Sequence, residues 1–406
     1  MGFNIQRHKE LTQVETRQDT ALGCMRWGTD NSFPQTLTNL IAQSPSAKPA
    51  VSRTAKFYKG AGFAGENEVV SPYGLTLKKV VSILADDYAV FEAFAIQCNY
   101  NVDGKVVSLN PMRIAELRFN QFDELNFASK IGYHEDFGRN AVVQKTVANT
   151  VTRSKIRWIE RYNPDVVLKQ IDKLGKQEKP NGGKMEQKLA GIGKYGGQIL
   201  YHSESGHSSY PIPPLQAPVN FVLADVENSV LVRKESSTGF VNTYLLKTAM
   251  DSEDATLIAL EDSIDASQGA RGTGSVITMS GLSPEEIQST VLEEIGAGSG
   301  GRKGVIESAE VAYNLSQKVI NGAYLIPPIL AGADQKTGFS SADLKEAYFI
   351  FNSITQYGRD TIESELNRIL SNSIFNTQSI EIKKLRLDEA ETEETKDDTQ
   401  IKEKPE

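Results

Sequence analysis

Two glycine-rich stretches are the parts of this sequence whose residue types come nearest to a nucleotide or phosphate site. Residues 191–196 read GIGKYG and so have the GxGxxG spacing of a dinucleotide site. Such a site needs a strand before the glycines and a helix that opens on them, because the helix N-terminus holds the pyrophosphate. Here the strand-like residues 198–202 follow the glycines. The order of elements therefore argues against a nucleotide.

The second stretch, residues 298–304, reads GSGGRKG and resembles a phosphate-binding loop only in composition. The Gly-Lys-Ser/Thr end that would bind the phosphates and a magnesium ion is absent, and no buried strand leads into the glycines. We therefore interpret these residues as a flexible or turn-rich connection.

The other candidates for chemistry are four histidines and two cysteines. The histidines are His8, His134, His202 and His207. None stands in an HExxH or other metal-ligand spacing, and no serine lies in a GxSxG context. Cys24 and Cys98 are far apart and have no CxxC partner. The sequence therefore predicts buried, reduced thiols, no metal, no cofactor and no catalytic activity.

Composition and charge limit the classes of function. Hydrophobic residues make up 39% and charged residues 24% of the 406 residues, as in soluble globular proteins. No apolar run reaches the roughly 18 to 20 residues of a membrane span, and the polar N-terminus lacks the apolar core of a signal peptide, so we expect no membrane contact. The net charge of −8 argues against a broad basic face that grips nucleic acid, but it suits a channel along which DNA slides.

The first half of the chain mixes helices and strands. Apolar residues at helical spacing predict three helices, and Asp103-Gly104 between two apolar runs predicts a β-hairpin. The expected helices begin at Pro34, span 46–58 up to a stop at Gly60-Ala61-Gly62, and span 76–88; the expected strands are 91–100, 106–109, 142–151 and 156–162. This order predicts an α+β fold.

The second half starts with residues 171–197, which are rich in Lys, Gly, Gln and Glu and are expected to form an exposed excursion. The later expected elements are a helix at 217–235, a small αβ insertion (strand 241–247, helix 252–267, strand 274–279) and helices at 305–324 and 341–371. Val311, Leu315 and Val319 form one stripe on the first of these two helices, and Ser340 with Asp343 offers a capping pair for the second. Beyond residue 387 the composition is typical of a disordered acidic tail.

Several short motifs resemble tailed-phage portal proteins in their order and spacing. Residues 27–34 (WGTDNSFP) are similar to the family's opening WGxDNxxP signature, and Ser44-Pro45 and residues 60–63 (GAGF) follow. Residues 210–214 (YPIPP) stand at the start of a helix, and residues 325–332 (LIPPILAG) are similar to the family's VPPxLLG segment. Residues 338–340 (GFS) and 346–349 (EAYF) match its late helix. The resemblance covers most of residues 26–371.

The resemblance implies a portal-type α+β fold with a mixed wing, a two-helix stem, a small αβ clip and a long late helix. The parts would be the wing at 1–215, the first stem helix at 216–236, the clip at 237–302, the second stem helix at 303–325, the tunnel loop at 326–339 and the long wing helix at 340–371. Residues 372–406 would be a reduced crown and a disordered acidic tail, which departs from family members with a helical crown.

The resemblance also implies partners and a place of action. The chain would form a homo-oligomeric ring of about twelve subunits at the portal vertex of the virion, assembled in the host cytoplasm, through which double-stranded DNA is packaged and ejected. Its protein partners would be the large terminase subunit, which would hydrolyse ATP, the major capsid and scaffolding proteins, and head-completion or tail proteins. The tunnel-loop residues expected to face DNA are Gly332, Gln335, Lys336, Thr337 and Gly338. Lys336 is the only cation in this loop, so we hypothesise transient phosphate contacts.

Two other interpretations stay open at this point. Another ring-forming head-to-tail or baseplate protein would share the acidic, non-catalytic character without needing two stem helices around an insertion. An enzyme with an unrecognised site could use the glycine-rich stretches to bind phosphate, and stabilisation by nucleotides would reveal it.

Overall fold

The computed structural model describes residues 16–124, 127–135, 137, 155–206, 210–238, 243–247, 275–279, 292–295, 301–332 and 341–386. The strand predicted at 142–151, the helix predicted at 252–267, Ser340 of the capping pair and the acidic tail beyond 387 lie outside these residues.

A six-stranded mixed sheet forms the centre of the body, with the strand order β4-β3-β8-β7-β6-β5. The strands are β3 (Ala93–Tyr100), β4 (Val106–Met112), β5 (Leu117–Phe119), β6 (Lys130–Tyr133), β7 (Arg157–Arg161) and β8 (Gln198–Ser203). Only β7 and β8 pair in parallel. The α+β fold, the β3–β4 hairpin and the strand predicted at 156–162 are confirmed.

Two helices occupy the connection between the parallel strands β7 and β8, where the sequence predicted an exposed excursion. They are α5 (Val167–Glu178) and α6 (Lys184–Lys194). A side chain at Gly175 would overlap the backbone of Gln187, and one at Gly191 would overlap the backbone of Ile171. Gly191, the first glycine of GIGKYG, therefore serves helix packing, since it lies inside α6 and no strand leads into it.

The sheet has an apolar core on each face because side chains alternate along a strand. In β3, Ala93 and Ala95 belong to one core, and Phe94 and Ile96 belong to the other. Helices α1 (Phe33–Gln43) and α2 (Ala47–Lys59) supply the first core, and α3 (Leu77–Phe91) supplies the second. All three helices were predicted, and Thr76 caps α3 by accepting from the backbone N–H of Lys79.

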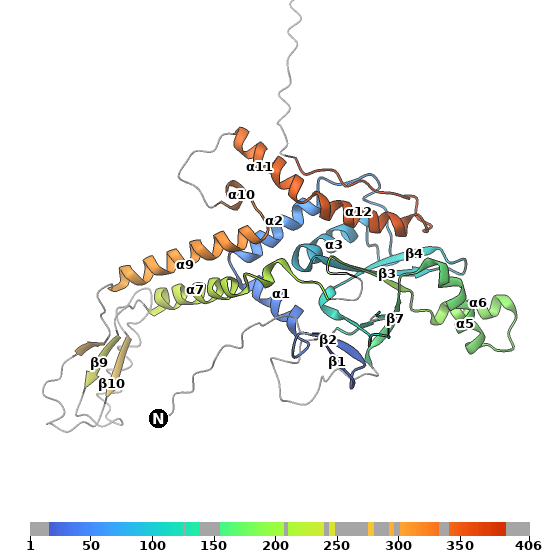
Figure 1. Cartoon of the computed structure of the whole chain (residues 1–406), viewed down its shortest axis with the longest axis horizontal. Helices are drawn as coiled ribbons and strands as arrows, with labels where there is room; N and C mark the ends of the chain where they lie inside the picture. Colours follow the sequence, from blue (N-terminus) through green and yellow to red (C-terminus); the bar gives the residue numbers. More distant parts are fainter. Residues whose placement is uncertain are drawn as a thin grey trace, which may run out of the picture.

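A two-helix arm projects from this body (Figure 1). Helices α7 (Val219–Thr238) and α9 (Gly301–Ala323) lie side by side, and the far end carries a three-stranded sheet in the order β10-β9-β11. Both helices were predicted, as were β9 (Thr243–Lys247) and β10 (Ser275–Met279), but β11 (Leu292–Ile295) was not. The glycine-rich stretch is helical from Gly301 onward, so the expectation of a flexible connection is wrong for that part.

The single helix predicted at 341–371 is two helices, α11 (Ser341–Ile354) and α12 (Gln356–Leu370), joined at Thr355. The hydroxyl of Thr355 donates to the carbonyl of Phe351 at 2.7 Å. Arg359 donates to the carbonyl of Asn352 at 2.7 Å and to the Thr355 hydroxyl at 2.9 Å. In a continuous helix these carbonyls would accept only from backbone N–H groups four residues later. Here the side chains compete for them, which accounts for the break. A short helix, α10 (Pro328–Ala331), precedes α11.

Candidate functional site

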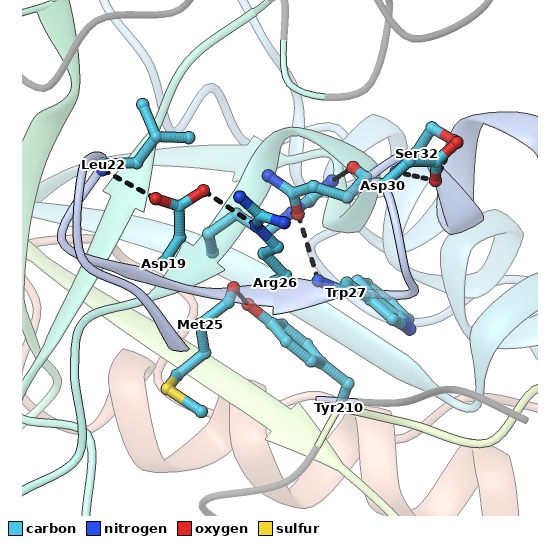
Figure 2. A network of polar contacts seen from close by, with 10 residues as sticks. Asp19, Leu22, Met25, Arg26, Trp27, Asp30, Ser32 and Tyr210 are labelled. Atoms are coloured by element: carbon cyan, nitrogen blue, oxygen red, sulfur yellow. Dashed lines mark hydrogen bonds and ion pairs between the residues drawn. The ribbon is translucent and has the colours of Figure 1, made fainter. Parts of the chain in front are cut away.

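The WGxDNxxP-like residues form a turn between β2 (Cys24–Trp27) and α1 (Figure 2). Asn31 has a left-handed backbone, with φ of 63°, and its side-chain oxygen accepts from the backbone N–H of Trp27 at 3.0 Å. Asp30 accepts from both the backbone N–H and the hydroxyl of Ser32, at 3.2 and 2.6 Å. The motif thus fixes the angle at which the chain leaves the β1–β2 hairpin, in which β1 is Thr16–Asp19, and starts α1.

Arg118 of β5 holds this turn from inside the body. The guanidinium donates to the side-chain and backbone oxygens of Asn31, to the carbonyl of Leu117 at 2.7 Å and to that of Ala115 at 2.9 Å. It lies 5.8 Å from the ring centre of Trp27, and it is fully buried. Burial lowers the pKa of Arg118, but the five-donor group has several acceptors in place of water.

The proline cluster at 210–214 joins the same centre through Tyr210 (Figure 2). The ring of Tyr210 stacks on Trp27, with ring centres 4.6 Å apart and planes inclined by 4°. Its hydroxyl donates to the carbonyl of Met25 at 2.7 Å and accepts from the backbone N–H of Phe119 at 3.1 Å. Two of the motifs in the resemblance therefore meet at one structural centre, in which Trp27, Asn31 and Tyr210 are buried.

Asp225 of α7 attaches the arm to the corner between α1 and α2. Its carboxylate accepts from the hydroxyls of Ser44 and Ser46 and from the backbone N–H of Ser46, the last two at 3.1 and 3.0 Å. Asp225 is 1% exposed. These bonds account for Ser44 in the resembling pattern, because the corner after α1 presents donors to α7.

The outer part of the arm exposes apolar side chains. Val311 and Leu315 of α9 are 66% and 52% exposed, and Val230, Leu231 and Val232 of α7 are all exposed as well. Val311 and Leu315 of the predicted stripe therefore face away from the body, and the buried residues of α9 include Ala309, Ser316 and Ile320 instead. A helix with apolar residues on several sides is normally covered on several sides.

The structure places only one of the predicted tunnel-loop residues. Gly332 ends α10 with a φ of 74°. Gln335, Lys336, Thr337 and Gly338 lie outside the described residues, so the structure does not bring the predicted set together.

His202 and the two cysteines lie among other residues of the fold. His202 Nε2 lies 3.1 Å from Glu204 and its Nδ1 lies 3.7 Å from Glu365; His8 and His207 lie outside the described residues. Cys24 and Cys98 are buried free thiols, as predicted, and burial raises the pKa of Cys24 to about 11. Within the described ranges, no cluster of His, Cys, Asp and Glu could hold a metal ion, and no helix could span a membrane.

Sequence reasoning missed the roles of Arg118 and Asp225. Each is a single charged residue within an otherwise apolar stretch, Leu117-Arg118-Phe119 in one case and the start of the α7 helix in the other. A lone charge in an apolar stretch is a signal for a buried polar contact, because such a group stays inside only when it is hydrogen-bonded.

Comparisons with known proteins give remote structural likenesses alone. No family model and no curated protein matches the chain. A chain of the virion of a native gene transfer agent particle aligns with a TM-score of 0.48 and 13% identity over 86% of this chain and 83% of that chain. A chain in the neck of an empty particle, computed with C6 symmetry, aligns with a TM-score of 0.46 and 12% identity over 86% of this chain and 83% of that chain. A chain in the neck of a native particle, computed with C12 symmetry, aligns with a TM-score of 0.41 and 13% identity over 86% of this chain and 84% of that chain.

Proposed function

We propose that this chain is a portal-type protein, one subunit of a ring that forms the DNA channel at a single vertex of a phage or phage-like capsid. The observation that carries the proposal is the arm: two helices, α7 and α9, run side by side from a well-packed body and flank an insertion that includes a three-stranded sheet. This arrangement supports the stem and clip that the motif resemblance implies, which we propose for α7, α9 and the insertion.

The apolar surface of the arm supports assembly into a ring. Leu315 and Val311 of α9 and Leu231 of α7 offer apolar area that water contacts in the isolated chain. Burying this area stabilises an assembly by about 25 cal/mol per Å². The occupant we propose is the arm of the next copy, because identical head-to-tail contacts close into a ring when the rotation permits. We propose about twelve copies, as in the family that the chain resembles.

DNA would pass through the ring without being gripped. The chain has a net charge of −8, so a ring of copies repels a polyanion overall and favours sliding. We propose that residues 326–339 face the DNA, with Lys336 as the cation that touches phosphates transiently. ATP hydrolysis would belong to the large terminase subunit, and this chain would do no catalysis.

The insertion at 237–302 would be the docking part. It lies between the two arm helices and can contact a motor, and later head-completion or tail proteins, without disturbing the packing of the body. The body would contact the capsid and scaffolding proteins, and the protein would act in the virion after assembly in the host cytoplasm.

The test is native mass determination together with negative-stain imaging of the full-length protein. A ring with a central channel and a mass of about twelve subunits is expected. A persistent monomer or dimer, even with a capsid scaffold present, would contradict the proposal. Binding to the large terminase subunit that disappears when residues 240–300 are deleted would separate a portal from another ring-forming head-to-tail or baseplate protein.

A further inference from the structure

A cavity of about 320 Å³ lies where α2, α3 and the end of α9 meet the junction of α11 and α12. Figure 1 shows these elements converging above the sheet. The chemistry-bearing residues of its lining are four tyrosines and two glutamates, namely Tyr58, Tyr88, Tyr324, Tyr357, Glu92 and Glu204. An aromatic and acidic lining is the kind that recognises organic cations, because ring faces and carboxylates both attract positive charge.

Hydrogen bonds position the carboxylate of Glu204 at the wall of the cavity. It accepts from the hydroxyl of Tyr88 at 2.7 Å and from that of Tyr357 at 3.1 Å, and His202 Nε2 lies 3.1 Å away. Burial opposes ionisation of Glu204, but the hydrogen bonds from Tyr88 and His202 outweigh it and hold the pKa of Glu204 below its usual value. The cavity therefore contains a carboxylate that is fixed and charged at neutral pH.

The second carboxylate, Glu92, has no compensating charge. Within the described part of the chain, its side chain makes no hydrogen bond and no ion pair. Burial, and then the charge of Glu204, raise the pKa of Glu92. The charged form of a half-buried carboxylate beside another one is unfavourable, and a cation between the two would stabilise it.

The backbone at the cavity is also strained. Glu92 has φ of 52° and Leu325 has φ of 52°, and both line the cavity. Left-handed backbone is unfavourable for side chains of this size, and such residues concentrate where a ligand is held. At Glu92 this conformation ends α3 and directs the chain into β3, with the carboxylate placed at the cavity.

We propose that this cavity binds an alkylammonium or guanidinium group between Glu92 and Glu204, with the faces of the tyrosine rings around it. The group comes either from a free amine or from a lysine or arginine side chain of another protein chain. This site is independent of the ring proposal, because it rests on the lining of one chain. The open side of the cavity, where Tyr357 is 66% exposed, allows access for either source.

Titration of the full-length protein by calorimetry tests the site. The probes are spermidine, as a free amine, and N-acetyl-lysine methylamide, as a side chain, with N-acetyl-norleucine methylamide as the neutral analogue. We expect the two cations to bind and the neutral analogue to bind at least tenfold more weakly. Replacing either carboxylate (Glu92→Gln or Glu204→Gln) should weaken the cations about tenfold, which corresponds to about 1.4 kcal/mol. Glu178→Gln, which removes an exposed carboxylate at the end of α5, should leave binding unchanged.

One further variant and a cross-linking experiment also test the site. Tyr357→Phe removes one hydroxyl from an exposed ring, so it folds normally and should weaken the cations less than the glutamate variants do. Zero-length carbodiimide coupling identifies the source: an amide between Glu92 or Glu204 and a lysine of another chain indicates a side chain, and a small-amine adduct indicates a free ligand. Equal binding of the neutral analogue, or cation binding that survives both Glu92→Gln and Glu204→Gln, would overturn the site.

Discussion

Asp225 of α7 accepts hydrogen bonds from both the backbone N–H and the hydroxyl of Ser46, 179 residues earlier in the chain. The pair connects the arm to the corner between α1 and α2 at a buried position. Because an ionised acceptor forms stronger hydrogen bonds than a neutral one, this contact fixes where α7 leaves the body.

We predict that Asp225→Ala destabilises the protein by about 3 kcal/mol, because it leaves the donors of Ser44 and Ser46 buried without an acceptor. Ser46→Ala removes one hydroxyl donor and should reduce the free energy of unfolding by about 1 kcal/mol. Denaturant titration followed by circular dichroism measures both changes. An Asp225→Ala variant as stable as the parent would show that α7 is held by its apolar contacts alone.

Replacement of Arg118 by lysine should lower the free energy of unfolding by about 3 kcal/mol, although the charge is kept. Lysine cannot reach the two oxygens of Asn31 and the carbonyl of Leu117 together, since it lacks the planar fork of donors. Arg113→Lys, at an exposed position directly after β4, is the matched control and should change stability by less than about 0.5 kcal/mol. Equal thermal midpoints of the two variants would refute a structural role for the Asn31–Arg118 contact.

Gly60→Ala should release the C-terminal segment from the body. Gly60 has φ of 60° and ψ of −158°, and a side chain there would overlap the carbonyl of Lys383. That carbonyl accepts from the backbone N–H of Ala61 at 2.9 Å. We expect a loss of at least about 2 kcal/mol and faster proteolysis within residues 371–386.

Gly74→Ala is the control for Gly60→Ala, because Gly74 also has positive φ, 78°, but nothing lies within 4 Å of the added carbon. It should show the conformational cost alone, about 1 kcal/mol, with no change in proteolysis. Identical behaviour of the two variants would mean that the approach of Lys383 contributes nothing.

The stability of the protein should depend on pH through Asp87. Burial raises the pKa of Asp87 to about 7, against the hydrogen bond that it accepts from the backbone N–H of Ile114 at 3.0 Å. The folded protein therefore holds this proton at a pH where the unfolded chain, with a pKa of 3.8, has lost it. The contribution of Asp87 is present in full below pH 4 and is lost as the pH rises to about 7.

Asp87→Asn should remove this dependence, so its stability relative to the parent protein should be higher at pH 7.5 than at pH 4.5. The side chain keeps some contact with solvent, so we expect a change of about 1 to 2 kcal/mol between these conditions. Asp172→Asn, at an exposed site on α5, should leave the dependence intact. Thermal midpoints of the three proteins across this range provide the measurement, and parallel curves would contradict the assignment.

Leu315→Glu should prevent ring assembly without loss of protomer stability. Leu315 is 52% exposed, so the substitution removes little buried area within the chain but places a charge in the proposed interface. Asn314→Glu introduces the same charge at an adjacent exposed position of α9 and should disturb assembly less. Native mass spectrometry measures the number of subunits in the oligomer. If the Leu315→Glu variant still forms the ring, the interface does not include this face of α9.

The sequence by itself determined those helix ends and turns that depend on a few neighbouring residues. The proline at the start of α1, the glycine stop after α2 and Asp103-Gly104 in the β3–β4 hairpin act through the backbone angles that their residues adopt. The helices of the arm were likewise predicted, since apolar spacing over twenty residues is a strong signal. The WGTDNSFP motif also predicted a portal-like chain, which stays a prediction, and it could not reveal that Trp27 and Asn31 are buried.

Only the tertiary structure decided which groups from distant parts of the chain meet. The break at Thr355 depends on Arg359 reaching back to Asn352, and the exposed face of α9 depends on where α7 packs. The same holds for the aromatic and acidic cavity, because all six strands of the central sheet lie between Glu92 and Glu204 in the sequence. Periodicity reports that a face is apolar or a residue charged, but the partner that covers or neutralises it is set by long-range packing.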